Sequence, residues 1–334
     1  MKTFFISLFI LLAFGFSSSA QNVITVQNGN KVQFYASLDS AYVHVSDGDT
    51  LYLPGGSYGS LTISKNLTII GVGHNPDSTK ATGKTLLSGL ILNTGADNGS
   101  VTGIYFSGSI VFNSEVNGYT INRCYIGNSI GYSLPLSNGG SKIGVMDDII
   151  ILDLNLSKFS NCLVSNNLIS GVTNAVNSEV KNNIFLNTNN SSYPPNSLYA
   201  NNCTVENNIF GYFGYETNCV LNNNINDDGR YGTGGNQVNG NYMNVEPFHS
   251  IFVNYDSTSM TFQNIYKADF HLVSDSPYKN AGTDGTAIGI YGGTFPWKVG
   301  SIPYNPHIKI NSVAGTTDAN GNLKVNITVE AQGH

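Results

Sequence analysis

The sequence predicts an all-β chain folded as a right-handed parallel β-helix, with an N-terminal capping helix and a C-terminal β-hairpin. Three observations predict this fold. A short motif with asparagine corners repeats through the middle of the chain, charged residues make up only 11% of the sequence, and glycine occurs 37 times. Amphipathic helices need charged outer faces, so this composition favours many short strands separated by turns.

The repeat consists of four segments that align without gaps and begin at Asn161, Asn177, Asn202 and Asn218. Each segment has Asn, a small residue, any residue, Val or Leu, any residue, Asn, Asn and then an apolar residue. A unit of this length is too short for a pair of helices or a propeller blade. It fits one coil of a solenoid, in which each strand pairs with its equivalents roughly 4.8 Å above and below.

Asparagine suits the corners of such a coil for two physical reasons. Its side chain tolerates the left-handed backbone region, and stacked carboxamides can hydrogen-bond from coil to coil. Apolar residues beside the corners, such as Val205 and Ile209, are expected to point inward and to stack in ladders. Between Ile126 and Asn161 the repeat is unclear, and two coils or one long excursion would both fit.

The four cysteines do not have the pattern of a disulfide framework. Cys162, Cys203 and Cys219 occupy one position of the repeat, and Ser178 takes that position in the remaining copy. A stack of parallel side chains gives poor disulfide geometry, so we expect buried free thiols. Zinc is the alternative, but it requires converging ligands and not a linear column.

The chain begins like a signal peptide. Lys2 precedes an apolar run from Phe4 to Phe16, and small residues follow up to Ala20. We therefore expect a signal peptide over residues 1–20, a β-helix with its N-terminal cap over residues 21–300, and C-terminal capping strands over residues 301–334. No later run approaches the roughly 20 apolar residues of a membrane helix, so the expected location is extracellular or at the cell surface.

The beginning of the expected solenoid carries further motifs. Phe34 to Tyr42 is apolar at helical spacing, and it precedes Gly48-Asp49-Thr50-Leu51, Pro54-Gly55-Gly56-Ser57-Tyr58 and Leu67-Thr68-Ile69-Ile70-Gly71-Val72-Gly73. This order closely resembles the opening of pectin-lyase-like right-handed β-helix proteins. Together with the asparagine coils, the resemblance covers about residues 30 to 245. It implies the fold and leaves the activity open, because that fold hosts many functions.

A second resemblance lies near the C-terminus. Asp269 to Gly282 and Ala287 to Gly293 resemble the closing segment of exported β-helix proteins from the Bacteroidota, which has Phe-His-Leu, Ser-Pro, Asn-Ala-Gly and Ile-Gly-x-Tyr-Gly-Gly in that order. Residues 308 to 331, with a turn at Asn320-Gly321, predict a terminal hairpin. We expect this hairpin to cover the exposed edge of the last coil.

Charge excludes one class of partner. The net charge is −6, and the chain has two arginines, Arg123 and Arg230, with no basic cluster. Nucleic-acid binding therefore has no electrostatic support. The expected partner is a polysaccharide or a cell-surface glycan. No motif indicates a metal or a cofactor, and calcium likewise has no motif to support it.

Two acidic pairs are candidates for chemistry. Asp147-Asp148 could belong to a catalytic cluster, but it also reads as the end of a buried strand. Asp227, Asp228 and Arg230 lie in a loop that leaves the repeat beginning at Asn218, and this loop is our preferred candidate for ligand contact. An Asp-Gly turn with an ordinary surface pair is the alternative there.

Aromatic contact with a ligand is expected beside the loop inserted at residues 187 to 200. This loop overhangs the solenoid and brings Tyr199 near it, and aromatic rings stack on sugars. The alternative is that the loop is only a tolerated insertion with no role in binding. Two functions follow. The first is a non-catalytic protein that binds glycans or serves as a structural, adhesin-like rod. The second is a polysaccharide lyase or glycoside hydrolase acting on an acidic polysaccharide.

Overall fold

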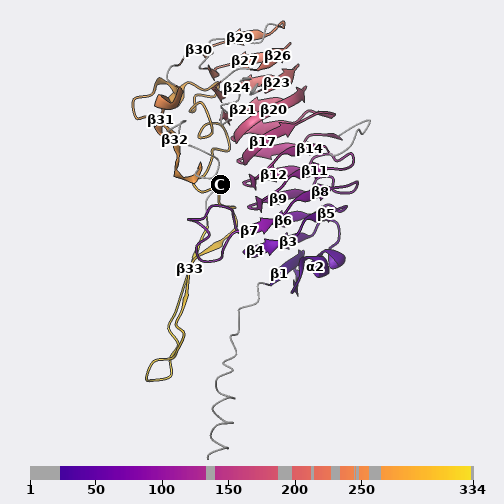
Figure 1. Cartoon of the computed structure of the whole chain (residues 1–334), viewed down its shortest axis with the longest axis vertical. Helices are drawn as coiled ribbons and strands as arrows, with labels where there is room; N and C mark the ends of the chain where they lie inside the picture. Colours follow the sequence, from indigo (N-terminus) through magenta and orange to yellow (C-terminus); the bar gives the residue numbers. More distant parts are fainter. Residues whose placement is uncertain are drawn as a thin grey trace, which may run out of the picture.

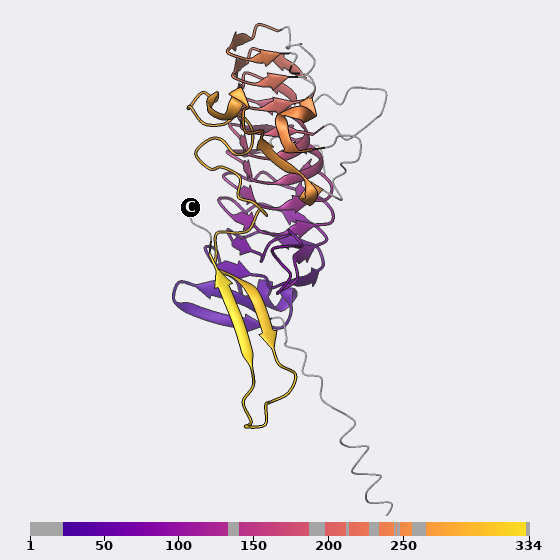
Figure 2. The same ribbon diagram turned by 90° about the vertical axis from the view of Figure 1, so that its left-hand side faces the viewer.

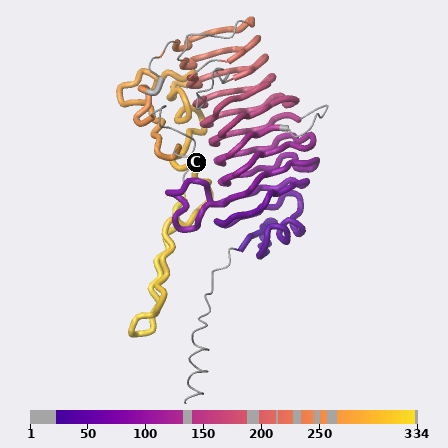
Figure 3. Tube along the Cα trace, viewed as in Figure 1, coloured from indigo at the N-terminus to yellow at the C-terminus, as the bar shows by residue number. Residues whose placement is uncertain are grey.

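The chain folds as a parallel β-helix in a computed structural model, which describes residues 23–132, 140–186, 198–211, 214–226, 234–243, 245, 248–255 and 265–331. Successive coils stack along one axis, with the N-terminal coils at one end and the C-terminal coils at the other (Figure 1). The tube trace shows the coils as parallel rungs (Figure 3). The all-β prediction and the solenoid prediction are confirmed.

The first face of the solenoid is a sheet of twelve strands. Its ten coil strands run parallel, and two antiparallel strands precede them at the N-terminal end. In spatial order the strands are β2 (Lys31–Tyr35), β1 (Ile24–Asn28), β3 (Thr50–Tyr52), β6 (Thr68–Ile70), β9 (Ser100–Thr102), β12 (Thr120–Asn122), β16 (Gly144–Met146), β19 (Leu163–Ser165), β21 (Glu179–Lys181), β24 (Thr204–Glu206), β27 (Val220–Asn222) and β29 (Gln237–Asn239).

The second and third faces join into one sheet because two long strands bend from one face to the other. The second face contains β4 (Gly56–Tyr58), β7 (Thr85–Leu87), β10 (Tyr105–Phe106), β13 (Tyr125–Ile126), the start of β17 (Ile149–Asn155), the start of β20 (Leu168–Val176), β22 (Ile184–Phe185), β25 (Ile209–Phe210), β28 (Ile225–Asn226) and β30 (Tyr242–Met243). The third face contains β5 (Leu61–Ile63), β8 (Leu90–Leu92), β11 (Ile110–Phe112), β14 (Ile130–Tyr132), the ends of β17 and β20, β23 (Leu198–Asn201) and β26 (Tyr215–Thr217).

Inward side chains form continuous apolar ladders, as the repeat predicts. On the first face, Val164 pairs with Val180, Val180 pairs with Val205, and Val205 pairs with Leu221. None of these four side chains is exposed to solvent. Because each coil buries its apolar residues only against its neighbours, the stack of coils is the core of the protein.

The coil path between Ile126 and Asn161 is also settled. Ile126 pairs with Ile150, and Ile150 pairs with Ile169. Two coils therefore separate Ile126 from Ile169, and the alternative of one long excursion is wrong. Asp147 and Asp148 form a corner of the first of these coils, between β16 and β17.

The column at the cysteine position exists as predicted. The backbone N–H of Cys162 donates to Ser178 Oγ over 3.0 Å, that of Ser178 donates to Cys203 Sγ over 3.4 Å, and that of Cys203 donates to Cys219 Sγ over 3.3 Å. These cysteines and Cys124 are all buried, and all are free thiols. The prediction of buried free thiols is confirmed.

The N-terminal cap differs slightly from its prediction. The helix α2 (Leu38–His44) begins after Ser37, whose side chain accepts the backbone N–H of Ser40 over 3.2 Å. Phe34, which we expected at the start of this helix, lies instead in the edge strand β2. Leu38 and Ala41 are buried, so the helix packs its apolar side against the first coils.

After the last coil the chain turns back along the solenoid. Its elements are η1 (Phe248–Ile251), β31 (Phe252–Asn254), η2 (Ile265–Lys267), β32 (Asp269–Leu272) and η3 (Pro277–Asn280). Figure 1 shows this segment beside the C-terminal coils. Phe252 and Phe270 share an apolar cluster with Ile184, Ile209 and Ile225 of the second face. Ile209 is therefore buried on the outer side of this face, and the prediction that it points into the coil interior is wrong, because its neighbour Phe210 takes the inward position. This face is therefore covered, and it is not an open groove over these coils.

The terminal hairpin forms, but not where we expected it. Strands β33 (His307–Val313) and β34 (Val325–Glu330) pair with each other in a separate two-stranded sheet. The hairpin lies near the N-terminal coils and projects beyond them (Figure 2). The expectation that it covers the last coil is wrong, because residues 281–304 first carry the chain back toward the N-terminal end.

Candidate functional site

The two asparagines of each pair have different roles: the first forms the outer corner of the coil, and the second points into the solenoid. The first member of each pair has a left-handed backbone, with φ of 58° at Asn166, 56° at Asn182, 57° at Asn207 and 50° at Asn223. The second member points inward. Asn167 Nδ2 donates to Asn183 Oδ1 over 3.0 Å, and Asn183 Nδ2 donates to Asn208 Oδ1 over 2.9 Å. The predicted corner conformation and amide ladder are both confirmed.

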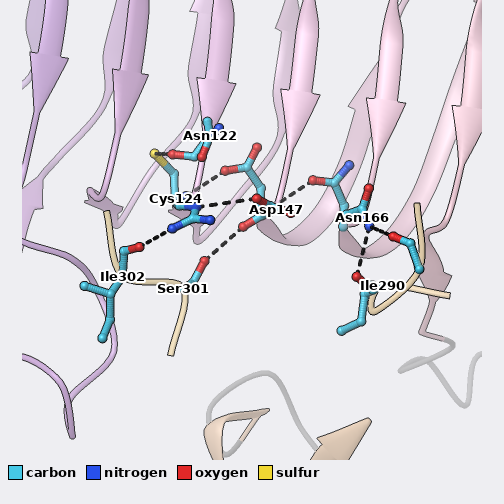
Figure 4. A network of polar contacts seen from close by, with 11 residues as sticks. Asn122, Cys124, Asp147, Asn166, Ile290, Ser301 and Ile302 are labelled. Carbon is cyan, nitrogen blue, oxygen red and sulfur yellow. Dashed lines mark hydrogen bonds and ion pairs between the residues drawn. The ribbon is translucent and has the colours of Figure 1, made fainter. Parts of the chain in front are cut away.

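The first asparagines hold residues 281–304, which we call the strap. Asn166 Nδ2 donates to the carbonyl oxygens of Ile290, over 2.9 Å, and Gly292, over 2.8 Å. Asn223 Nδ2 donates to Ala281 O over 2.7 Å. Figure 4 shows the contacts of Asn166 with the strap. The strap therefore runs down the corners of several coils, and the repeat carries one strap anchor per coil.

Asp147 and Asp148 occupy the same corner as the paired asparagines. Asp147 has a φ of 56°, and strand β16, just before it, pairs in register with β19, just before Asn166. The equivalent corner one coil earlier is Arg123, with a φ of 53°. The two aspartates therefore point to different sides of one corner, as neighbouring asparagines do, and they do not form a paired-carboxylate site.

Asp147 forms a buried ion pair with Arg123. Arg123 Nε lies 3.4 Å from Asp147 Oδ2, and the side chains of both residues are almost completely buried. Burial raises the pKa of Asp147 to about 6, although Arg123 pulls it down. The Arg123 guanidinium also lies 3.5 Å from the centroid of the Tyr304 ring and donates through Nη1 to Ile302 O.

The strap closes over this pair. Ser301 Oγ donates to Asp147 O over 3.0 Å (Figure 4). Ile302 and Tyr304 lie against Arg123. Both charged groups are thereby shielded from any polymer outside the solenoid. The structure therefore supports the structural alternative for Asp147-Asp148. The sequence could have indicated this structural role, because the two aspartates align in register with the asparagine pairs of the later coils.

Tyr199, the aromatic residue predicted to contact ligand, lies on the outer side of the third face. It pairs in register with Tyr215 on the next coil. The two ring centroids are 5.4 Å apart with an interplanar angle of 26°, and the residues are 36% and 65% exposed. Because the rings face each other, Tyr215 is the one with more surface left for a further stacking partner. We call this pair the tyrosine ridge.

The other predicted contact residues, Asp227, Asp228 and Arg230, lie outside the described residues. Their contact with a ligand therefore stays a prediction. Within the described part of the chain, no three His, Cys, Asp or Glu side chains converge on a metal position.

A groove of about 600 Å³ lies where the strap leaves the solenoid. One wall contains Tyr52, Pro54 and Ile70, and the other contains Pro303 and Pro306. Its volume suits a small ligand. Sequence reasoning missed this groove because its two walls are far apart in the chain, and no motif joins them.

His271 also has neighbours that bear on its role. Its Nδ1 lies 2.6 Å from Asp269 Oδ1, and its ring stacks on Tyr291 with centroids 3.7 Å apart. These contacts join the Phe-His-Leu part of the closing segment to the Ile-Gly-x-Tyr-Gly-Gly part. They support a structural role for His271.

Comparisons with known proteins give one structural likeness. No family model matches the chain, and no curated protein matches it. Among solved structures, the chain is similar to the crystal structure of pectate lyase Pel9A, with 15% sequence identity and a TM-score of 0.41, over 80% of this chain and 91% of that one.

Proposed function

We propose that the protein is an exported, non-catalytic β-helix that binds a polysaccharide or a cell-surface glycan at the tyrosine ridge. The observation that supports this proposal is the exposed, nearly parallel pair formed by Tyr199 and Tyr215 on neighbouring coils. Exposed aromatic rings provide flat apolar surfaces for the C–H faces of sugars. The rings stand on the outer side of the third face, outside the apolar core, where a ligand can reach them.

The surroundings of the ridge add polar groups that suit sugar hydroxyls. Asn201 and Thr217 lie on the same two strands and are exposed. Asn174, also exposed, donates through Nδ2 to Asn155 Oδ1 over 3.2 Å on the same face. Amides and hydroxyls both donate and accept hydrogen bonds, so they can bind ring hydroxyls in several orientations.

The proposed location outside the cell rests on the signal-peptide pattern of residues 1–20. No helix in the described residues is long and apolar enough to cross a membrane. The expected ligand is therefore a glycan of the extracellular space or the cell surface.

The test is binding of the chain from Gln21 to immobilised pectin, alginate, glycosaminoglycans and neutral glycans. Tyr215→Ala and the double substitution Tyr199→Ala/Tyr215→Ala should lower retention at least tenfold, because they remove the exposed rings. Phe295→Ala is the matched control, since Phe295 is 59% exposed and lies in the strap. Tyr52→Ala tests the groove at the end of the strap instead.

Three outcomes would contradict the proposal. Unchanged retention after the double substitution would remove the ridge as the binding surface, and loss of retention on Tyr52→Ala alone would move the site to the groove. Formation of unsaturated products or new reducing ends during incubation would favour the lyase or hydrolase alternative. In that case Arg230→Ala is the first variant to assay.

A further inference from the structure

Among the residues that the structure describes, the sheet of the first face has two edges without a pairing strand, one at each end of the molecule. Strand β2 is terminal at the N-terminal end and pairs only with β1, whereas β29 is terminal at the C-terminal end and pairs only with β27 among the described strands. Unpaired edge strands expose N–H and C=O groups that can pair with another chain. The ends of this sheet are therefore two candidate interaction surfaces.

The two edge strands run in the same direction. Strand β2 is antiparallel to β1, and β1 is antiparallel to β3, which runs parallel to the coil strands up to β29. A second copy placed further along the axis in the same orientation would bring its β2 beside β29 of the first. The new pair would be parallel, like every coil-to-coil pair of this face, so the contact would continue the existing stack.

At the C-terminal end, the last residue of an inward apolar ladder is exposed because no coil follows it among the described residues. Val238 continues the inward ladder of Val205 and Leu221, yet it is 44% exposed, whereas the other two are 0% exposed. Strand β29 has the sequence Gln-Val-Asn and carries no charge. Natural edge strands are usually protected by a lysine, a proline or a bulge, and this strand has neither residue.

The N-terminal end exposes apolar side chains of its own. Phe34 on β2 is 68% exposed, and Val43 on α2 is 73% exposed. Figure 1 shows α2 beside β1 at this end of the stack. Both ends of one molecule thus combine a free strand edge with exposed apolar groups.

We propose that the protein associates head to tail, with β2 and α2 of one copy docking on the last coil of a second copy. The two surfaces differ, so the contact is heterologous, and repetition would give linear assemblies and not closed dimers. The interface would continue the β27–β29 pairing of the solenoid and would cover Val238. This proposal does not depend on glycan binding.

The test is sedimentation of the chain from Gln21 over a concentration series. The N-end variant carries Phe34→Asp and Val43→Asp, the C-end variant carries Val238→Asp, and the control is Leu152→Asp. Leu152 is 49% exposed and lies in the middle of the solenoid. The wild type and the control should grow in average mass with concentration, whereas each end variant alone should stay monomeric.

Mixing the two end variants gives the sharpest result. One intact C-terminal end and one intact N-terminal end remain in the mixture, so it should form dimers with one copy of each variant and nothing larger. Circular dichroism checks that each variant is folded. If Val238→Asp disturbs the last coil, the N-end variant alone still tests the proposed interface, because every such interface requires one intact N-terminal end.

Three results would overturn the proposal. They are a wild type that stays monomeric at all concentrations, end variants that associate like the control, and a folded mixture that forms no dimer. Association that survives both end substitutions would point to another surface, such as the exposed Val325, Ile327 and Val329 of the terminal hairpin.

Discussion

The backbone N–H of Cys124 donates to Asp148 Oδ1 over 2.6 Å, and this contact is the first step of the asparagine ladder. The N–H of Asp148 donates in turn to Asn167 Oδ1 over 2.8 Å, and the N–H of Asn167 donates to Asn183 Oδ1 over 3.0 Å. Asp148 therefore stands in a column of carboxamides. Its second oxygen, Oδ2, is buried and has no hydrogen-bond partner among the described residues.

Asp148→Asn should stabilise the protein at neutral pH. In the ladder, Asn167 Nδ2 donates to Val145 O and Asn183 Nδ2 donates to Val164 O, so an amide at position 148 should donate to Ile121 O, which is equivalent one coil earlier. Satisfying a buried polar group is worth about 1–3 kcal/mol. Equilibrium unfolding in urea at pH 7 measures the gain.

The same variant has a defined pH dependence. Burial raises the pKa of Asp148 well above its ordinary value, so the folded chain binds this proton at higher pH than the unfolded chain does. The proton therefore stabilises the wild type at low pH, and this stabilisation is lost as the pH rises through the folded pKa. The advantage of Asp148→Asn should vanish in acid, and an advantage that is equal at pH 4 and pH 7 would contradict this account.

The reverse substitution, Asn183→Asp, should destabilise the protein at pH 7. It places a carboxylate beside Asn208 Oδ1 and removes the donor to Val164 O. Asn167 still donates to one oxygen at this position, but the second carboxylate oxygen is buried without a donor, which costs about 2–4 kcal/mol. The cost should shrink in acid, where the new carboxyl takes up a proton. Thermal unfolding at two pH values tests this, and a loss that is independent of pH would point to a packing defect.

Much of the fold could be predicted because every coil needs the same residue types at its corner and ladder positions, so these residues recur in the sequence. Left-handed corners favour asparagine or glycine, and the ladder favours an amide at a fixed spacing, so both produce a visible period in the sequence. The asparagine pair predicts the corner and the ladder. It does not show that its first member binds the strap, because the partners of Asn166 are carbonyl groups more than 120 residues away.

The candidate site could be predicted less well. Tyr199 was found from its place beside an inserted loop, but its partner Tyr215 has no motif and is recognised only from the strand register. The ion pair between Arg123 and Asp147 was missed because its residues replace asparagines in coils whose repeat is degenerate. The placement of the hairpin could not be predicted either, since it depends on the path of the strap.

Asn166→Gly should loosen the strap without disturbing the corner. Glycine accepts the left-handed backbone of Asn166, but it removes both donors to Ile290 O and Gly292 O. The expected loss of stability is about 1–3 kcal/mol, with faster amide hydrogen exchange in residues 287–293. Asn161→Gly is the matched control, because Asn161 has a φ of 55° at an exposed corner. Equal exchange in the two variants would remove the anchoring role.

The four thiols should be unreactive in the folded protein. Burial raises the pKa of Cys124 and Cys162, so both remain protonated at neutral pH. The hydrogen bond with Cys203 lowers the pKa of Cys219 to about 7, so this thiol is protected by its burial, which all four cysteines share. A thiol-specific reagent should label no cysteine in native buffer and all four after unfolding in guanidinium. Fewer than four labelled thiols in the unfolded, unreduced protein would indicate a disulfide and would contradict the free column.

Arg123→Met should destabilise the protein strongly, and Asp147→Asn should reverse most of that loss. The single substitution leaves the buried Asp147 carboxylate without its cation, which costs about 3–5 kcal/mol. In the double variant the carboxylate is gone, and an asparagine stands at a left-handed corner like those of the later coils. Unfolding of the wild type, both single variants and the double variant gives the coupling free energy between the two positions. Additive effects would show that the ion pair is not what holds this corner, and that the contacts of Arg123 with Ile302 and Tyr304 matter more.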